Sequence, residues 1–407
     1  MKVSYFHLMP YQDLPRDFET RYRSAWVDLP NEHFDPAKGG QYYRDYLAQL
    51  QHADSLGFDG ICVNEHHCNA YGLMPSPNLM ASILTQTTTD AALIVLGNSL
   101  ALYQPPLRVA EEMAMLDIMS GGRLVAGFPV GTSMDTTFSY GQVPLQLRER
   151  HSEAHDLIMK SWSERKPFAF NGKYTKLRYV NIWPRPLQQP HPPVWIPGSG
   201  SLETWDWVLN RNYVYCYLSY FGYQRAEKVV QGYWDTVAER GIDDNPHRFG
   251  FLQLVCVSET DEQAERDYAE HVKYFYQKML WIYPPFAEAP GYRSIYSMRK
   301  SARAQTGQEA AKAALEMGWK DYVEKGHVIA GSPSAVREQL TDAVKRLRIG
   351  HLMCLLHIGS MPDEIARKNT ELFAKEVMPS MQGIFSEYDD PWWPQAVSRP
   401  LAAPTVG

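Results

Sequence analysis

Short apolar runs alternate with segments of helical spacing along almost the whole chain, and this alternation constrains the fold more than any other feature. We expect eight strands, and each is followed by a segment whose apolar residues recur every three or four positions. The expected strands lie at residues 2–9, 58–63, 92–103, 124–127, 193–197, 213–217, 249–257 and 351–357. Alternation without blocks of consecutive strands favours a parallel barrel over a doubly wound sheet. The sequence therefore predicts an α/β fold of the (β/α)8 TIM-barrel type.

Three segments interrupt the alternation. Residues 168–182 read as a hairpin that turns at Asn171-Gly172. Residues 281–327 are rich in proline and glycine and show little strand pattern, so we expect a mobile insertion near the barrel mouth, before the last strand. Residues 382–407 are rich in proline and alanine, which predicts a C-terminal arm outside a single barrel domain spanning 1–381.

Composition and charge exclude several classes of protein. The chain has 407 residues and a net charge of −6, without the clustered lysine and arginine of a nucleic-acid surface. No apolar run approaches the roughly 20 residues that a membrane-spanning helix needs, and the N-terminus has no signal-peptide pattern. Five widely spaced cysteines without a CxxC motif indicate neither a disulfide framework nor a zinc ribbon. We expect a reduced, cytoplasmic protein that binds neither membranes nor nucleic acid.

The stretch Phe58–Pro77 carries the strongest chemical signal. An apolar strand ends in Glu65-His66-His67, and catalytic groups of α/β barrels lie at the carboxyl ends of the strands. His66 is the leading candidate for acid–base catalysis, because imidazole titrates near neutral pH. His67 and Glu65 are candidates for a catalytic or an orienting role, and structural histidines at a strand end are the alternative. Adjacent residues of a strand face opposite sides, so no metal is expected at this cluster.

The stretch Gly198-Ser199-Gly200-Ser201 is the best candidate for an anion site. Its glycines allow close approach of the backbone, its serines donate hydrogen bonds, and the helix that follows offers free N–H groups. A plain helix cap at Ser201 is the alternative reading.

Several blocks of the sequence, taken together, resemble the bacterial luciferase-like flavin-dependent monooxygenases. The chain contains FDGICVNEHH, then a block that runs from two prolines through MSGGRLVAGFPVG, and later the motifs FNGKY and PPVWIPGSGS. The resembling blocks are 58–67, 105–131, 148–162, 170–174, 185–201, 327–340 and 373–381.

The resemblance implies an enzyme that uses reduced FMN and O2 to oxidise a small or medium-sized organic substrate. Members of this family are commonly homodimers that receive FMNH2 from a separate flavin reductase, and the absence of a GxGxxG motif fits a protein without its own nicotinamide site. One branch of the family binds the deazaflavin F420. An F420-dependent hydride-transfer enzyme and a non-catalytic flavin-binding relative therefore remain alternatives.

The resemblance also implies roles for individual residues. His66 would lie at the reactive edge of the flavin, and the loop Gly198–Ser201 would hold its phosphate. Asn98 and Ser99 occupy the region where the family often has a non-proline cis peptide beneath the flavin ring, with a regular strand end as the alternative. Tyr140 would line the ring or simply pack against its neighbours.

One position departs from the family pattern. Val130 stands where many relatives have an arginine that pairs with the flavin phosphate. Thr132, Ser133 and Arg148 are candidates to replace that arginine.

Overall fold

The computed structural model describes residues 1–218, 220–287, 289–292 and 316–395, and its core is a closed parallel barrel. Each strand pairs with the next around the barrel, and β11 pairs with β1 to close it. The eight strands of the barrel are β1 (Lys2–Phe6), β2 (Gly60–Val63), β3 (Ala92–Leu96), β4 (Leu124–Gly127), β7 (Val194–Gly198), β8 (Val214–Tyr217), β9 (Phe249–Val257) and β11 (His351–Leu355). The TIM-barrel prediction is confirmed.

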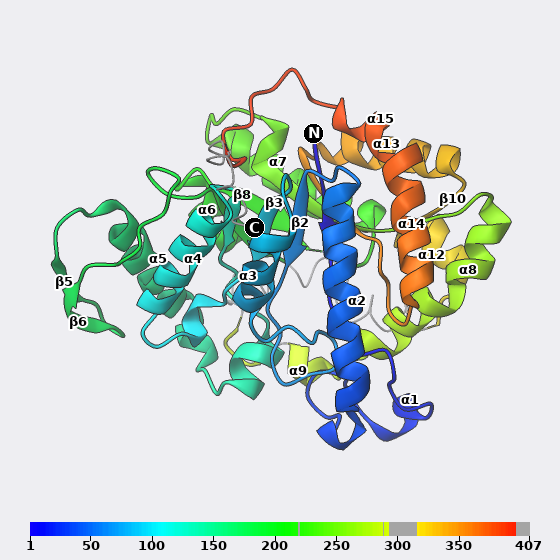
Figure 1. Cartoon of the computed structure of the whole chain (residues 1–407), viewed down its shortest axis with the longest axis horizontal. Helices are drawn as coiled ribbons and strands as arrows, with labels where there is room; N and C mark the ends of the chain where they lie inside the picture. The colour runs from blue at the N-terminus through cyan, green and yellow to red at the C-terminus, as the bar shows by residue number, and fades with distance from the viewer. Residues whose placement is uncertain (219, 288, 293–315, 396–407) are drawn as a thin grey trace, which may run out of the picture.

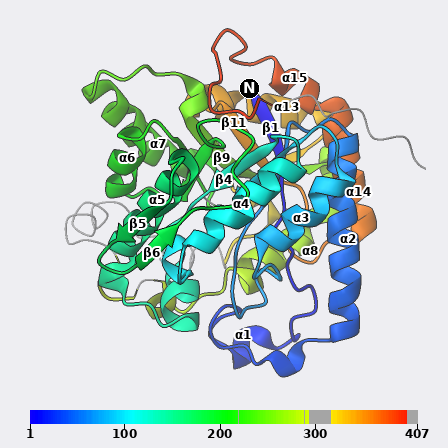
Figure 2. The ribbon, with the colours of Figure 1, turned by 60° about the vertical axis from the view of Figure 1, so that its left-hand side comes forward.

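Helices surround the barrel and cover the outer face of its strands, while side chains inside the barrel bury the inner face, which explains the continuous apolar runs of the strands (Figures 1 and 2). In α2, the side chain of Asp35 caps the first turn by accepting from the N–H groups of Ala37 and Lys38. The larger helices are α2 (Pro36–Ser55), α3 (Pro77–Thr87), α4 (Leu107–Met119), α5 (Leu147–Ser163), α6 (Leu202–Leu209), α7 (Tyr223–Glu239), α8 (Asp261–Tyr274), α13 (Pro333–Leu347) and α14 (Asp363–Glu376). Shorter ones are α1 (Phe18–Arg21), α9 (Pro284–Ala287), α12 (Trp319–Glu324) and α15 (Met378–Gln382).

The predicted hairpin is present as the antiparallel pair β5 (Phe168–Asn171) and β6 (Lys176–Val180). Two details differ from the prediction. The strand expected over residues 92–103 ends at Leu96, because the chain turns into a short 3-10 helix, Leu100–Leu102. A further strand, β10 (Val328–Gly331), was not predicted; it pairs with the carboxyl half of β9, Leu254–Val257.

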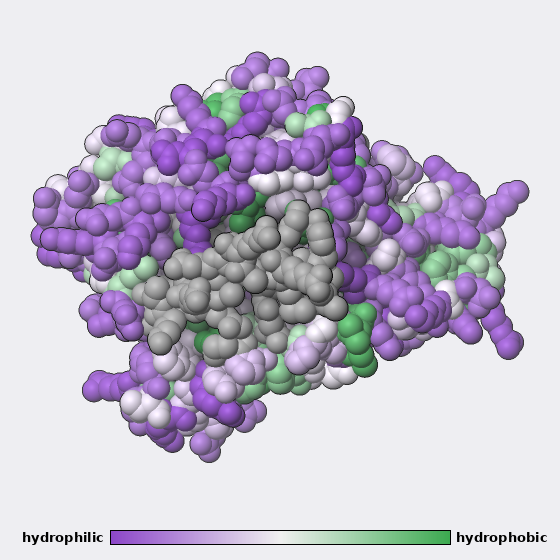
Figure 3. Space-filling view, turned by 180° about the vertical axis from the view of Figure 1, so that it is seen from behind, coloured by the Kyte–Doolittle hydropathy of each residue, from purple (hydrophilic) through white to green (hydrophobic). Residues whose placement is uncertain are grey.

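The start of the expected insertion lies over the carboxyl ends of the strands. Ile282 forms an isolated bridge with Ser24, and the backbone N–H of Ala289 donates to Ser133 Oγ at 3.0 Å. Residues 293–315, which make up about half of the segment predicted to be mobile, lie outside the described residues. The described part of the face shown in Figure 3 is mostly hydrophilic.

The described part of the C-terminal arm packs on the barrel itself. It leaves α15 and crosses the end of the barrel at which β1 begins (Figures 1 and 2). Trp392 is buried there, and its indole N–H donates to the carbonyl of Asn212 at 2.7 Å. Residues 396–407 lie outside the described residues. Among the described helices, none has the length and apolar character needed to cross a membrane.

Candidate active site

A cavity of about 560 Å³ opens at the carboxyl ends of the barrel strands, and it brings together the two motifs singled out in the sequence. His66 and Glu65 line the cavity after β2, and Gly198–Ser201 lines it after β7. Parallel strands in a barrel all present their carboxyl ends at one rim, so residues far apart in the sequence meet there. The volume is in the range of small-molecule and cofactor sites.

His66 is held by a buried carboxylate that the sequence analysis did not identify. Its Nδ1 lies 2.9 Å from Asp135 Oδ2, and Asp135 stands on the π-helix Met134–Ser139 after β4. None of the described residues hydrogen bonds to Nε2 of His66, and the ring belongs to the cavity wall. The rings of Trp26 and Tyr71 meet the imidazole edge-on, each with its centroid 4.9 Å away, so little water reaches it from that side.

Asp135 is an ionised acceptor. Burial acts to raise its pKa, but the positive charge that His66 can carry and hydrogen bonds from His66, the His67 backbone and Thr132 outweigh burial and lower the pKa overall. The His67 N–H and Asn69 Nδ2 donate to Oδ1 at 2.9 and 3.1 Å, and the Thr132 hydroxyl donates to Oδ2 at 2.8 Å. A carboxylate can only accept, so the Nδ1 of His66 carries the proton. In the neutral ring, the lone pair of Nε2 is then left for the cavity.

Glu65 organises a second cluster beside the cavity. Its carboxylate accepts from the Ser99 N–H and Asn98 Nδ2, both at 3.3 Å, and from the Tyr103 hydroxyl in a short hydrogen bond. His67 Nε2 lies 3.0 Å from Glu65 Oε1. A buried carboxylate with this many partners fixes the positions of the groups around it.

The Gly198–Ser201 loop has the form of an anion cradle. Gly200 has φ +95°, a conformation that side chains rarely adopt, and its N–H donates to the Tyr215 hydroxyl at 2.7 Å. A Cβ at Gly198 would come within 2.9 Å of the Tyr215 ring, so glycine is needed for the close approach. The loop leads into α6, whose first N–H groups have no partner within the helix.

Arg148 supplies positive charge to this loop from α5. Its guanidinium donates to Ser201 Oγ at 3.0 Å and to Thr204 Oγ1 at 3.2 Å, and the Ser201 hydroxyl in turn donates to Glu203. Lys228 of α7 lines the same part of the cavity. Val130, which stands at the position of the family's arginine, also lies in the cavity wall and carries no charge. Arg148 and Lys228 are the lysine and arginine side chains that line the cavity and can replace that charge.

The other sequence-predicted residues lie at varying distances from the cavity. Ser99 lines it, whereas Asn98 is buried behind Glu65. A non-proline cis peptide occurs at Leu96-Gly97, directly before Asn98. His67 and Tyr140 are not part of the wall, because the Tyr140 ring packs on His67 at 4.3 Å and is 45% exposed. Tyr292, at the edge of the insertion, completes the wall and donates to the carbonyl of Gly131.

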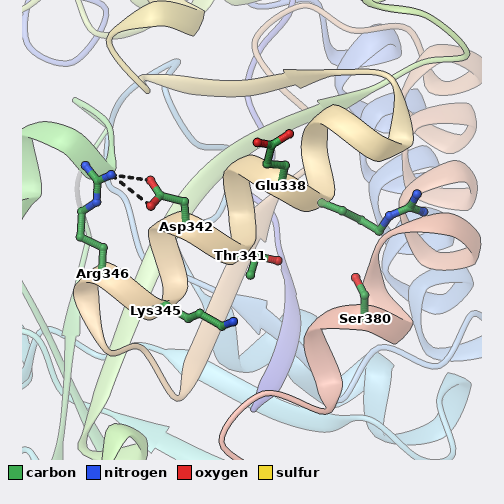
Figure 4. Close-up of a pocket in the computed structure, with 7 residues that line it drawn as sticks. Glu338, Thr341, Asp342, Lys345, Arg346 and Ser380 are labelled. Atoms are coloured by element: carbon green, nitrogen blue, oxygen red, sulfur yellow. Dashed lines mark hydrogen bonds and ion pairs between the residues drawn. The ribbon is translucent and has the colours of Figure 1, made fainter.

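A second pocket lies outside the barrel and contains none of these residues. It is lined by charged side chains of α13 and by Ser380 of α15, and within it Arg346 pairs with Asp342 at 2.8 Å (Figure 4). No candidate acid–base or anion-binding motif opens onto it.

Comparisons with known proteins identify the family and the fold. Residues 23–349 match the model of a family described as luciferase-like monooxygenase. The oxygenase component of a flavin-dependent trigonelline monooxygenase from Acinetobacter baylyi is 27% identical over 230 residues, which cover 55% of this chain and 62% of that protein.

Two solved structures share the fold over nearly the whole chain. The oxygenating constituent of 3,6-diketocamphane monooxygenase from Pseudomonas putida, in complex with FMN, has a TM-score of 0.67 at 18% identity and covers 93% of this chain and 98% of its own. An F420-dependent secondary alcohol dehydrogenase has a TM-score of 0.63 at 17% identity, with 93% and 98% covered.

Proposed function

The chain belongs to the luciferase-like monooxygenase family, and we propose that it is the oxygenase of a two-component system that uses reduced FMN and O2 to oxidise a small or medium-sized organic molecule. The observation that carries the proposal is the shared cavity, in which the His66–Asp135 pair and the Gly198–Ser201 cradle face the same space. A separate flavin reductase would supply the FMNH2, in line with the oxygenase component among the relatives.

The residues at one end of the cavity suit an FMN phosphate. The cradle offers serine hydroxyls and the start of α6, and Arg148 and Lys228 bring two positive charges. A charge-assisted hydrogen bond from arginine to a phosphate oxygen is among the stronger polar contacts in proteins. Reduced FMN, when bound, supplies the electrons that place one atom of O2 in the substrate and reduce the other to water.

The chain itself controls protons and water. Asp135 keeps the proton of neutral His66 on Nδ1, so Nε2 can take a proton from a group in the cavity and return it. The negative charge of Asp135 also stabilises the imidazolium that forms in between. Trp26, Tyr71 and Tyr292 wall the space with aromatic rings, and excluding water strengthens every electrostatic interaction inside.

The proposal is tested by comparing the two cofactors of the family. Anaerobic titration should show saturable binding of FMNH2, and mixing the complex with O2 should consume oxygen and return oxidised FMN. Turnover of F420H2 without oxygen consumption would instead support the hydride-transfer alternative, which the F420-dependent structural relative keeps in view. Failure to bind either cofactor would refute both.

We also propose that the protein forms a homodimer through α3 and α4, which lie side by side on the outside of the barrel (Figures 1 and 2). Large apolar side chains are exposed along both helices, whereas the solvent-facing side of an outer helix usually carries polar residues. They are Leu79, Ile83, Met115, Ile118 and Met119. A second copy of the same face would cover them, as symmetric dimers commonly do.

A further inference from the structure

Three potential metal ligands converge at the opposite end of the barrel from the cavity. They are His247 of the 3-10 helix Pro246–Arg248, His351 at the start of β11, and Asp390 of the C-terminal arm. One ligand atom from each lies within 4.8 Å of the others, and among the described residues this is the one group of its kind. The two histidines are 4% and 1% exposed, so the cluster is enclosed.

Several polar atoms of this cluster lack a hydrogen-bond partner. His247 Nδ1, both ring nitrogens of His351 and Asp390 Oδ2 are buried without an aligned partner. Buried polar atoms are almost always satisfied, and a group of them aimed at one point indicates a ligand between them. His247 Nδ1 lies 3.2 Å from Asp390 Oδ2, close to the roughly 3.3 Å that separates two ligands of a tetrahedral zinc ion. His351 Nε2 lies 3.7 Å from Asp390 Oδ1.

The surroundings hold the ligands in place before any ion binds. Gly350 lets the two histidine segments meet, because a Cβ at this position would lie 2.5 Å from the His247 nitrogen. Its N–H donates to the carbonyl of Pro246 at 2.9 Å. The His351 ring packs between Trp195 and Trp393, with centroids 4.5 and 5.6 Å away.

The local charges suit a cation. Asp390 brings a carboxylate to the cluster, and an imidazole ring nitrogen without its proton can offer a lone pair to a cation. Two of the positive side chains nearby are paired with other carboxylates, Lys2 with Asp59 at 3.2 Å and Arg248 with Asp243 at 2.8 Å. The amino terminus donates to the carbonyl of Gln382 at 3.1 Å. Two imidazoles and one carboxylate are a ligand set that zinc accepts, with a fourth position left for water.

We propose that His247, His351 and Asp390 bind a divalent cation, with zinc as the best match, and that this ion fastens the C-terminal arm across the N-terminal end of the barrel. Two ligands belong to the barrel and the third to the arm, so the ion joins segments that are distant in the sequence. This end of a TIM barrel serves stability rather than catalysis. The site is therefore structural, and it is independent of the proposed flavin chemistry.

Metal content of untagged full-length protein tests the proposal. After loading with zinc and dialysis, the protein should retain about one zinc ion per chain. Asp390→Asn keeps the shape of the side chain and should weaken retention by about tenfold or more. His247→Asn provides a second variant should the first fail to fold. His52→Asn is the matched control, because His52 also pairs with a carboxylate, that of Glu371, but lies on the surface.

A second readout follows the arm itself. Chymotrypsin can cut after Tyr388 and Trp392 only when the arm lifts, so chelation should speed cleavage of the wild type by about tenfold. The same treatment should leave the rate for Asp390→Asn unchanged, because its arm is already released. Two results would overturn the proposal and leave the cluster an ordinary ion pair. One is less than a tenth of an equivalent of zinc in the wild type, and the other is zinc retention by both ligand variants equal to that of the wild type.

Discussion

Replacing Asp135 by asparagine tests the acid–base role that the structure gives to His66. The carboxylate accepts from two donors at each oxygen: the His67 N–H and Asn69 at Oδ1, and His66 and Thr132 at Oδ2. An asparagine amide can replace only one oxygen without loss. With its NH2 group in place of Oδ2 it faces His66, which can adapt by moving its proton to Nε2 and accepting at Nδ1.

The magnitudes of the two consequences differ. Only the Thr132 hydroxyl is left without its acceptor, so the free energy of unfolding should fall by about 1–3 kcal/mol. The His66 lone pair, however, no longer faces the cavity, and the negative charge that stabilises the imidazolium is gone. General acid–base catalysis contributes about 10²–10⁴-fold, and we expect a rate loss in that range.

Stopped-flow measurement of flavin oxidation by O2, with FMNH2 bound, gives the rate, and urea denaturation gives the stability. Nitrogen NMR of labelled histidine reports the position of the His66 proton whatever the cofactor proves to be. Asp156→Asn is the matched control, because Asp156 Oδ1 lies 3.2 Å from His155 Nδ1 outside the cavity. Rates within twofold of the wild type for Asp135→Asn, with the tautomer unchanged, would refute the reasoning.

Three further predictions concern the phosphate end, the apolar face and acid stability. Arg148→Gln should weaken FMN binding by about 1.5–3 kcal/mol in fluorescence titrations and leave the binding of riboflavin, which lacks the phosphate, unaffected. Equal losses of affinity for FMN and riboflavin would contradict the assignment. Arg150→Gln is the control. Ile83→Glu should shift the mass measured by light scattering from dimer to monomer, and an unchanged mass would exclude this interface. Burial lowers the pKa of His7 to about 4. Below a pH of about 6.5 the unfolded chain therefore binds a proton at this residue that the folded protein does not bind. The free energy of unfolding consequently falls as the pH drops from about 6.5 to about 4. The drop in unfolding free energy between pH 7 and pH 4.5 should therefore be about 2–3 kcal/mol smaller in His7→Asn, and an equal drop would show that His7 does not contribute.

The fold could be predicted from the sequence because the patterns that indicate its strands and helices are local. Each strand is a short apolar run, each helix has its own apolar stripe, and the eight-fold alternation leaves few arrangements other than a barrel. The same logic located His66 and the Gly198–Ser201 loop, since both follow strands whose carboxyl ends must meet at one rim. The extra strand β10 was missed because it is additional to the eight alternating strands and pairs only with the carboxyl half of β9.

The contacts between side chains of the candidate sites depended on the tertiary structure. Asp135 lies 69 positions from His66, on a short π-helix whose sequence shows no periodic apolar pattern, and no local signal distinguishes it from other aspartates. Arg148 faces the cradle because of the way α5 packs beside α6, and Tyr140 turned to His67 instead of the cavity. Asp390 meets the two histidines only because the arm folds back over the barrel. Sequence periodicity determines which elements form, whereas side-chain partners are set by loop conformation and packing between distant segments, which only the folded chain decides.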